Sequence, residues 1–158
     1  MLILIRGAGD IATGIAIRLH RSGMRVVMTD VARPTAIRRT VSFSGAIKSG
    51  RQTVEDVTAR LAAAPEEALE TTRGGDIAVL VDENCACLPA IAPDAMVDAI
   101  LAKRNLGTRR DMAPAVIGVG PGFTAGEDCH AVVETMRGHT LGRVYYSGCL
   151  LYTSPSPR

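Results

Sequence analysis

The chain has 158 residues, 47% of them hydrophobic and 22% charged, which is the composition of a soluble globular domain. Its 18 basic and 16 acidic residues leave a net charge of +2 and form no basic stripe with interleaved aromatic residues, so nucleic acid is excluded as an expected partner. No apolar run approaches the roughly 20 residues of a membrane-spanning helix, and we therefore expect no membrane segment and a cytoplasmic location.

The N-terminal part of the chain predicts a strand, a helix and a second strand. Residues 2–5 form a continuous apolar run, typical of a strand that is covered on both faces of a parallel sheet. Apolar residues at the helical period predict a helix over 11–20, and a second strand over 25–29 ends on Asp30. We predict an α/β fold with a Rossmann-like parallel sheet, helices on both of its faces, and small β-hairpins.

The turn between the first strand and the helix has the spacing of a dinucleotide-binding fingerprint. Gly7 permits the tight turn, and Gly9 lets the backbone approach a pyrophosphate. Ala12 takes the third-glycine position, where the helix packs on the strand. Asp10 is expected to be an N-cap or first-turn acid, the alternative being a ligand to a metal or substrate. The predicted cofactor-binding residues are Gly7, Ala8, Gly9, Asp10, Ile11, Ala12 and Asp30.

An acidic residue at the end of the second strand adds to this motif. Asp30 stands 21 residues after Gly9, where a carboxylate accepts hydrogen bonds from both hydroxyls of an adenine ribose. A carboxylate there disfavours a 2′-phosphate, so the sequence predicts NAD or a related adenine nucleotide rather than NADP. The alternative is that the glycines close a tight turn in an α/β fold that binds no nucleotide.

The later part of the chain predicts short strands, hairpins and helices, with a weak indication of a strand-to-helix passage over 34–50. We expect a hairpin over 53–58, a helix that begins at Pro65, strands over 76–81 and 115–119, a short helix over 84–91, and a second hairpin of 130–136 and 143–146. By periodicity alone 95–100 is either a strand or a helix, and the Pro-Asp pair before it favours a strand.

Two loops after later strands offer further ligand-binding candidates. Lys103 and Asn105 follow the strand over 95–100, and Gly120 and Gly122 follow the strand over 115–119. Ligands of open α/β sheets bind outside the carboxyl ends of the strands, so both loops could border one crevice with the first glycine turn. The alternative is a solvated basic turn and a flexible connection.

A dense set of metal-binding or acid–base side chains lies near residue 130. Strand alternation places His130 and Glu134 on one face, with His139 in the adjoining turn, and both His130 and Glu134 are possible ligand-binding residues. Their spacing matches no established metal motif, which favours a structural role and no metal. Cys85 and Cys87 form no CxxC pair, and all four cysteines are expected to be free thiols. No spacing identifies a catalytic group.

The domain organisation is predicted from the same segments. We expect a nucleotide-binding domain over 1–120 and the start of a β-rich C-terminal region over 121–148. The last residues, from Cys149 to Arg158, resemble one reading frame of a transposon adapter used in short-read DNA library preparation. We therefore expect 149–158 to be a non-native, adapter-derived tail, the alternative being a natural tail rich in Pro and Ser.

Four segments carry a resemblance to a known family: IRGAGDIATG at 5–14, DAILAKRNLGT at 98–108, GPGFTAG at 120–126 and HAVVETMRGH at 130–139. Together they resemble the YqeB-like proteins of the selenium-dependent molybdenum hydroxylase system. The resemblance implies an accessory or maturation factor with a Rossmann-like region similar to that of the XdhC group. It also implies partners, namely the molybdenum hydroxylase apoenzyme or other maturation factors, and a contact with molybdopterin.

Three functions therefore stand as hypotheses. The first is a nucleotide-binding accessory protein for maturation of a selenium-dependent molybdenum hydroxylase. The second is an NAD-dependent oxidoreductase of a small metabolite, although no set of proton-transferring residues stands at a persuasive spacing. The third is a non-catalytic nucleotide sensor.

Overall fold

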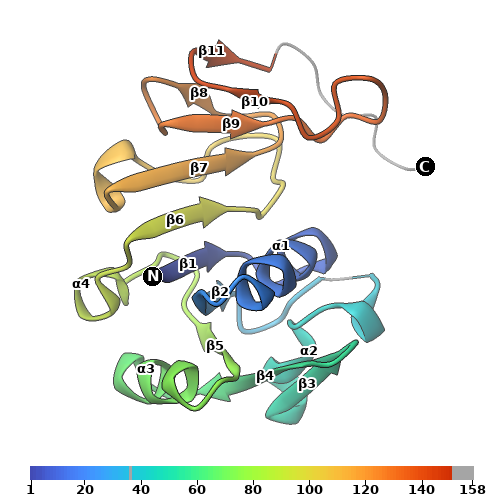
Figure 1. Cartoon of the computed structure of the whole chain (residues 1–158), viewed down its shortest axis with the longest axis vertical. Helices are drawn as coiled ribbons and strands as arrows, with labels where there is room; N and C mark the ends of the chain where they lie inside the picture. The colour runs from blue at the N-terminus through green and yellow to red at the C-terminus, as the bar shows by residue number, and fades with distance from the viewer. Residues whose placement is uncertain (36, 151–158) are drawn as a thin grey trace.

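A computed structural model describes residues 1–35 and 37–150. A nine-stranded, mostly parallel sheet in the order β10-β9-β7-β6-β1-β2-β5-β4-β3 organises the molecule, and β8 and β11 form a second, antiparallel pair (Figure 1). The strands are β1 (Leu2–Arg6), β2 (Arg25–Asp30), β3 (Arg51–Val54), β4 (Val57–Ala62), β5 (Ile77–Val81), β6 (Ala95–Asp98), β7 (Ala115–Val119), β8 (Thr124–Ala125), β9 (Ala131–Val133), β10 (Val144–Tyr145) and β11 (Gly148–Cys149).

Helices cover both faces of the main sheet, as predicted. They are α1 (Asp10–Arg21), α2 (Gly45–Ser49), α3 (Pro65–Arg73) and α4 (Leu88–Ile91), with 3-10 turns η1 (Arg39–Val41) and η2 (Arg110–Met112). Apolar residues of α1 and α2 pack in one core, and those of α3 and α4 pack in another. None of the helices that the structure describes has the length and apolar character needed to cross a bilayer.

The sequence of β1 explains why this strand lies in the middle of the sheet. Alternate side chains of a strand point to opposite faces, and here both sets are apolar. Ile3 and Ile5 enter the core under α1, whereas Leu2 and Leu4 enter the core under α3. A strand with two apolar faces is stable only where both are covered, as in a parallel sheet.

The strand order reverses at β1. The chain passes from β1 through β2 to β5 on one side, and returns to place β6 and β7 on the other side. Both neighbours of β1 run parallel to it, with Arg6 in register with Thr29 on β2 and with Asp98 on β6. Such a reversal leaves a crevice at the carboxyl ends of the strands, which is where open α/β sheets bind ligands.

Both predicted hairpins are confirmed. Strands β3 and β4 pair antiparallel around Glu55 and Asp56, with Val54 in register with Val57. Strands β9 and β10 pair antiparallel with Val133 in register with Val144. Because β9 also pairs with β7, the main sheet continues past residue 120, where we expected the nucleotide-binding domain to end.

Two predicted helical segments are shorter than expected. The segment over 84–91 becomes helical at Leu88, because Cys85 has a φ of 55° and the preceding residues form a turn. In the described residues of 34–50, which omit 36, the structure contains η1 and α2 and no strand. The strand predicted over 95–100 is confirmed, but β6 ends at Asp98.

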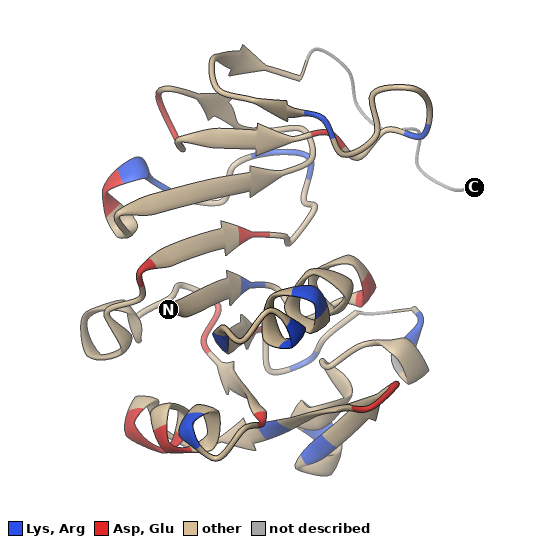
Figure 2. Cartoon of the chain, viewed as in Figure 1, with Lys and Arg blue, Asp and Glu red and all other residues tan. Residues whose placement is uncertain are grey.

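The end of the chain lies partly within the described structure. Gly148 and Cys149 pair with β8, and Leu150 packs against the core under α3. The rest of the expected adapter-derived tail, 151–158, lies outside the described residues. Figure 2 shows acidic and basic residues scattered along helices, loops and strand ends rather than gathered in one segment.

Candidate functional site

The two glycines of the first turn have different geometries. Gly7 has a φ of 104°, and a Cβ there would lie 3.1 Å from the carbonyl oxygen of Ala99. Gly9 has a φ of −69° and a ψ of −174°, which any residue adopts, and a Cβ there would meet no atom within 4 Å. Gly7 is therefore required by the fold, whereas the missing side chain of Gly9 leaves open space beside the backbone.

Helix α1 begins directly at this open space. Gly9 is its N-cap, and Asp10 is a first-turn acid whose Oδ1 accepts a hydrogen bond from the Ile11 N–H at 2.9 Å. Ala12 is buried in the core, as the fingerprint requires of the third position. A 12-residue helix carries a partial positive charge at its N-terminus, which favours an anion at this end.

Asp30 connects the end of β2 to the glycine turn. Its Oδ2 accepts a hydrogen bond from the Ala8 N–H at 3.1 Å, and its Oδ1 accepts one from the Val31 N–H at 2.8 Å. Burial raises the pKa of Asp30 above its usual value, and these two hydrogen bonds offset part of that effect. Each carboxylate oxygen has a second lone pair, so Asp30 can still accept from a ribose hydroxyl.

A cavity of about 720 Å³ lies over the turn. We call it the glycine cleft, and all seven predicted cofactor-binding residues line it, together with Arg38, Ile100 and Arg137. A second cavity of about 410 Å³, the Arg6 pocket, is lined by Arg6, Asp30, Asp82, Asn84 and Leu106, among others. Asp30 lines both, so the two cavities adjoin at the carboxyl end of β2.

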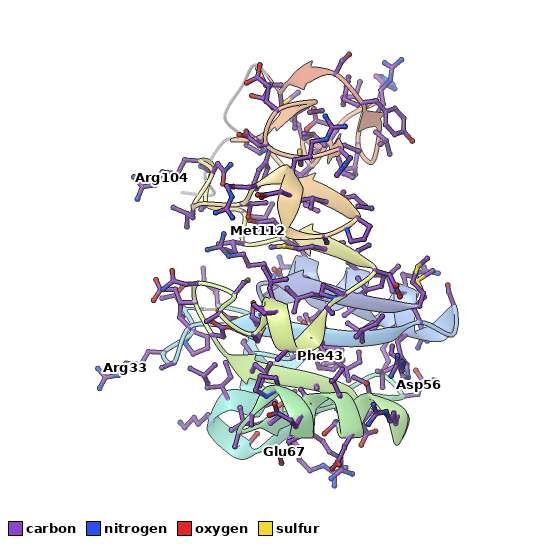
Figure 3. The ribbon with its side chains drawn as sticks, turned by 90° about the vertical axis from the view of Figure 1, so that its left-hand side faces the viewer. Arg33, Phe43, Asp56, Glu67, Arg104 and Met112 are labelled. Carbon is purple, nitrogen blue, oxygen red and sulfur yellow. The ribbon has the colours of Figure 1, made fainter. Side chains whose placement is uncertain are left out.

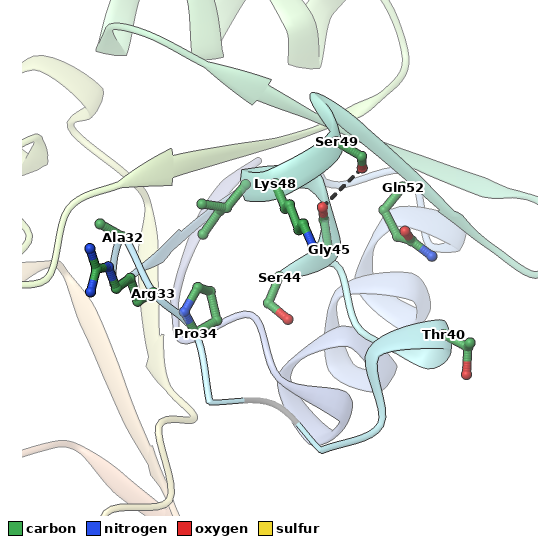
Figure 4. A pocket seen from close by; sticks show the side chains of 10 residues that line it. Ala32, Arg33, Pro34, Thr40, Ser44, Gly45, Lys48, Ser49 and Gln52 are labelled. Atoms are coloured by element: carbon green, nitrogen blue, oxygen red, sulfur yellow. Dashed lines mark hydrogen bonds between the residues drawn. The ribbon is translucent and has the colours of Figure 1, made fainter.

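A third cavity of about 610 Å³ lies beside α2 and contains none of the predicted site residues. Figure 4 shows the side chains that line it, among them Lys48 and Ser44, with Arg33 pointing away from the other labelled side chains. Pro34 lines both this cavity and the glycine cleft.

Lys103 and Asn105 contribute to a loop rather than to either of the cavities at the glycine turn. Asn105 Oδ1 accepts hydrogen bonds from the backbone N–H groups of Gly107 and Thr108, at 2.9 and 2.7 Å. Its Nδ2 donates to the Thr108 carbonyl at 2.8 Å. Lys103 is exposed, with a φ of 60°, and lines neither the glycine cleft nor the Arg6 pocket.

Gly120 and Gly122 lie against this same loop. A Cβ at Gly122 would stand 2.6 Å from the Cα of Arg104, and one at Gly120 would stand 2.9 Å from the Cδ2 of Leu101. The structure thus brings the two predicted loops together, and the glycines let them pack on each other.

His130 and Glu134 make structural contacts. His130 Nδ1 accepts from the Val116 N–H at 3.0 Å, joining β9 to β7. Glu134 is buried, its Oε1 accepts from the Met136 N–H at 2.7 Å, and its Oε2 has no hydrogen-bond partner among the described residues. His139 is exposed, and no group of three metal-ligating side chains occurs in the part of the chain that the structure describes.

The cysteines are free thiols, as expected. Burial raises the pKa of the Cys85 thiol, and for Cys87 burial and the neighbouring Asp82 carboxylate both raise the pKa. Since the thiolate is the nucleophile, neither residue is an activated thiol at neutral pH.

Sequence reasoning missed Arg6, the last residue of β1. Its side chain is buried, and its guanidinium donates to the carbonyls of Glu83 and Leu106, at 3.1 and 3.0 Å, and to Thr108 Oγ1 at 3.0 Å. It also lies 3.5 Å from Asp98 Oδ2, which accepts from the Thr108 hydroxyl at 2.5 Å. Arg6 fixes the loops that border its pocket. An arginine at the end of an otherwise apolar strand was the available signal.

Comparison with known proteins gives one relative. No family model matches the chain, and no solved structure matches it. The chain is similar to a protein of Escherichia coli (strain K12) named uncharacterized protein YqeB, with 59% identity over 148 residues. The match covers 94% of this chain but 27% of the relative, so the chain spans about a quarter of the relative's length. This similarity agrees with the resemblance of the four sequence segments to YqeB-like proteins.

Proposed function

We propose that the chain binds an adenine dinucleotide in the glycine cleft, NAD in preference to NADP. The open space at the Cβ position of Gly9 is the observation that carries this proposal, because it leaves the backbone accessible at the N-terminus of α1. A pyrophosphate there would meet N–H groups at the positive end of the helix. Asp30 lines the same cleft and supplies the acceptor for the ribose hydroxyls.

We further propose that this nucleotide-binding unit belongs to an accessory protein for maturation of a selenium-dependent molybdenum hydroxylase. The resemblance of the four segments supports this part of the proposal. The hydroxylase apoenzyme or another maturation factor is the proposed partner, and molybdopterin is a proposed contact. Because the chain spans about a quarter of the relative's length, this accessory role is proposed for a full-length protein and not for the present chain alone.

Titration calorimetry with NAD on a pair of glycine variants tests nucleotide binding. Gly9→Ala is expected to leave the melting temperature unchanged, since the backbone angles suit alanine and the new methyl group meets no atom. The same methyl group would occupy the space of the ligand and is expected to weaken binding of NAD at least about tenfold, the effect of about 1.4 kcal/mol of lost contact.

Gly14→Ala is the matched control. Gly14 is exposed on α1, and a Cβ there also meets no atom within 4 Å, but it does not line the glycine cleft. It is expected to bind NAD as the wild type does. Wild-type protein that binds none of NAD, NADP and ADP would overturn the proposed function.

A genetic test addresses the accessory role. Deletion of the gene in its host is expected to abolish selenium-dependent molybdenum hydroxylase activity, and the full-length gene is expected to restore it. The full-length Gly9→Ala variant is expected to fail although the protein accumulates normally. Full hydroxylase activity in the deletion strain would contradict the accessory role and leave the binding measurements standing.

A further inference from the structure

Two arginine side chains from distant segments reach the glycine cleft. Arg38 lies just before η1, and Arg137 lies in the loop between β9 and β10, and both line the cleft beside the turn. In Figure 1 both segments lie on the side of the sheet where the parallel strands end. Both side chains are exposed, and neither takes part in an ion pair among the described residues.

The charges of the cleft give the two arginines an electrostatic effect on any anion that enters it. Among the side chains that the structure describes, the charged ones that line it are two carboxylates, Asp10 and Asp30, and the two guanidinium groups of Arg38 and Arg137. With the carboxylates alone, the cleft would repel an anionic ligand. The arginines cancel that charge, and the N-terminus of α1 adds a partial positive charge. A guanidinium group also offers paired N–H donors that match two phosphate oxygens.

The loop that carries Arg137 is held by its own hydrogen bonds. The buried carboxylate of Glu134 accepts from the Met136 N–H, directly before Arg137. The Gly142 N–H donates to the Glu134 carbonyl at 2.9 Å, and the Leu141 N–H donates to the Gly138 carbonyl at 3.3 Å. Glu134 thus helps to hold the hairpin whose loop carries Arg137 at the cleft.

We propose that Arg38 and Arg137 clamp the diphosphate of the bound nucleotide, so that the cleft selects ligands with a diphosphate over nucleosides. This inference rests on the proposed nucleotide binding and extends it, because it makes the β9–β10 hairpin part of the site. The clamp joins residues that are nearly a hundred positions apart in the sequence.

Titration calorimetry of variants with ADP and adenosine tests the clamp. Arg137→Ala and Arg38→Ala are each expected to weaken binding of ADP and NAD about tenfold or more, in keeping with the loss of a charge-assisted hydrogen bond. Binding of adenosine, which lacks phosphate, is expected to change less than about twofold. Arg137→Lys keeps the charge but loses the paired donors, so its ADP affinity is expected to lie between those of wild type and Arg137→Ala.

Arg104→Ala is the control for the loss of one positive charge. Arg104 is exposed, lines neither cavity at the turn, and points away from the body of the molecule in Figure 3. It is expected to bind ADP like the wild type, and all variants are expected to keep the wild-type melting temperature.

The two proposals fail in different ways. If wild type binds NAD and Gly9→Ala weakens it, but both arginine variants bind ADP normally, the clamp alone is overturned. Equal losses of ADP and adenosine in the arginine variants also overturn it, because a clamp acts on phosphate. If wild type binds no adenine nucleotide, the proposed function fails and the clamp fails with it.

Discussion

Gly7 and Gly9 are separated by a single residue and are expected to respond differently to substitution. A methyl group at Gly7 is opposed twice, by its left-handed backbone and by the nearby carbonyl of Ala99. A methyl group at Gly9 is opposed by neither. The first glycine is therefore required by the fold, whereas the second is not and remains available for the proposed binding.

Gly7→Ala is expected to lower the free energy of unfolding by about 1 to 3 kcal/mol, the cost of a non-glycine residue in a sparsely populated conformation. Urea denaturation of both proteins measures this. Gly14→Ala is expected to change stability in the opposite direction by up to about 1 kcal/mol, since alanine is the better helix former. A Gly7→Ala protein as stable as wild type would contradict the geometry of the turn.

Asp30→Ala is expected to weaken NAD about 10- to 150-fold, because it removes hydrogen bonds of roughly 1.5 to 3 kcal/mol to a charged acceptor. The affinity for NADP is expected to fall much less, since the 2′-phosphate of NADP no longer meets a like charge in the variant. Calorimetry with NAD and NADP on wild type and variant gives the ratio of the two affinities for each protein. If the variant binds NAD as tightly as wild type, Asp30 is not the ribose ligand.

Acid is expected to weaken NAD through the same carboxylate. Protonation removes acceptor capacity from Asp30, and because burial raises its pKa, the loss begins at a higher pH than for an exposed aspartate. The contribution of Asp30 to folding stability changes with pH in the opposite direction. A raised pKa favours the protonated form in the folded state, so this contribution to stability is present at low pH and lost as pH rises through the pKa of folded Asp30. Asp30→Asn, titrated with NAD over pH 4 to 8, is expected to show a flatter profile.

Local spacing predicted the residues of the glycine turn, and the structure places all of them in one cleft. It did not predict the environment of Arg6, whose partners lie 77 to 102 residues away. It also could not show that the Asn105 side chain is used in hydrogen bonds to the backbone of its own loop, because those bonds depend on the turn at 105–108. Contacts within one motif follow from spacing, whereas contacts between distant segments follow from the topology.

At the scale of elements, the turn between β5 and α4 is held by one carboxylate. Asp82 accepts from the Ala86 N–H at 2.9 Å and from the Cys87 N–H at 2.8 Å. Burial alone would raise the pKa of Asp82, but the hydrogen bonds from Cys87 and Ala86 lower it below the usual value. These bonds also explain why the helix predicted over 84–91 begins late, since the first N–H groups of the segment are used in a turn.

Asp82→Asn is expected to reduce the free energy of unfolding by about 1 to 2 kcal/mol at pH 7, as it keeps a single acceptor oxygen and no charge. Because the pKa of folded Asp82 is lowered, its contribution is present above the unfolded pKa of about 3.9 and is lost as pH falls through the folded value. Denaturation at pH 7 and near pH 3 tests this: the gap between wild type and variant is expected to shrink in acid. A gap that stays constant would rule out the charge as its source.

The sequence predicted the strands of the sheet more accurately than the short helices, and the reason is physical. A buried strand such as β5 is an apolar run whose burial decides its conformation. The helices α2 and α4 have five and four residues, too few for a helical period to appear in the sequence. Their positions depend on packing against the sheet, which the sequence does not display locally.

At the scale of the whole molecule, Arg6 and Asp98 join the two halves of the sheet at its reversal point. Arg6→Met is expected to destabilise the protein by about 3 to 5 kcal/mol, because it leaves the buried Asp98 carboxylate without its cation. Arg60→Met is the control: its ion pair with Asp76 is half exposed, and its loss is expected to cost under about 1 kcal/mol. Urea denaturation measures both.

A double-mutant cycle of Arg6→Met and Asp98→Ala separates the interaction energy between Arg6 and Asp98 from the other contacts of each residue. The double variant is expected to be less destabilised than the sum of the single variants, since removing both charges leaves neither one buried alone. Additive effects would show that Arg6 acts through the Glu83 and Leu106 carbonyls rather than through Asp98.

The contact of Gly7 with Ala99 also has a consequence for synthesis of the protein. The glycine motif is translated before the wall of its turn, which comes from the end of β6, whose Asp98 is 92 residues from Arg6. At about 5 to 20 residues per second, a ribosome needs roughly 5 to 20 s to make that stretch. During this interval the nascent chain contains the glycine motif without the wall of its turn. The proposed nucleotide binding is therefore expected to follow translation of β6 rather than to assist the earlier steps of folding.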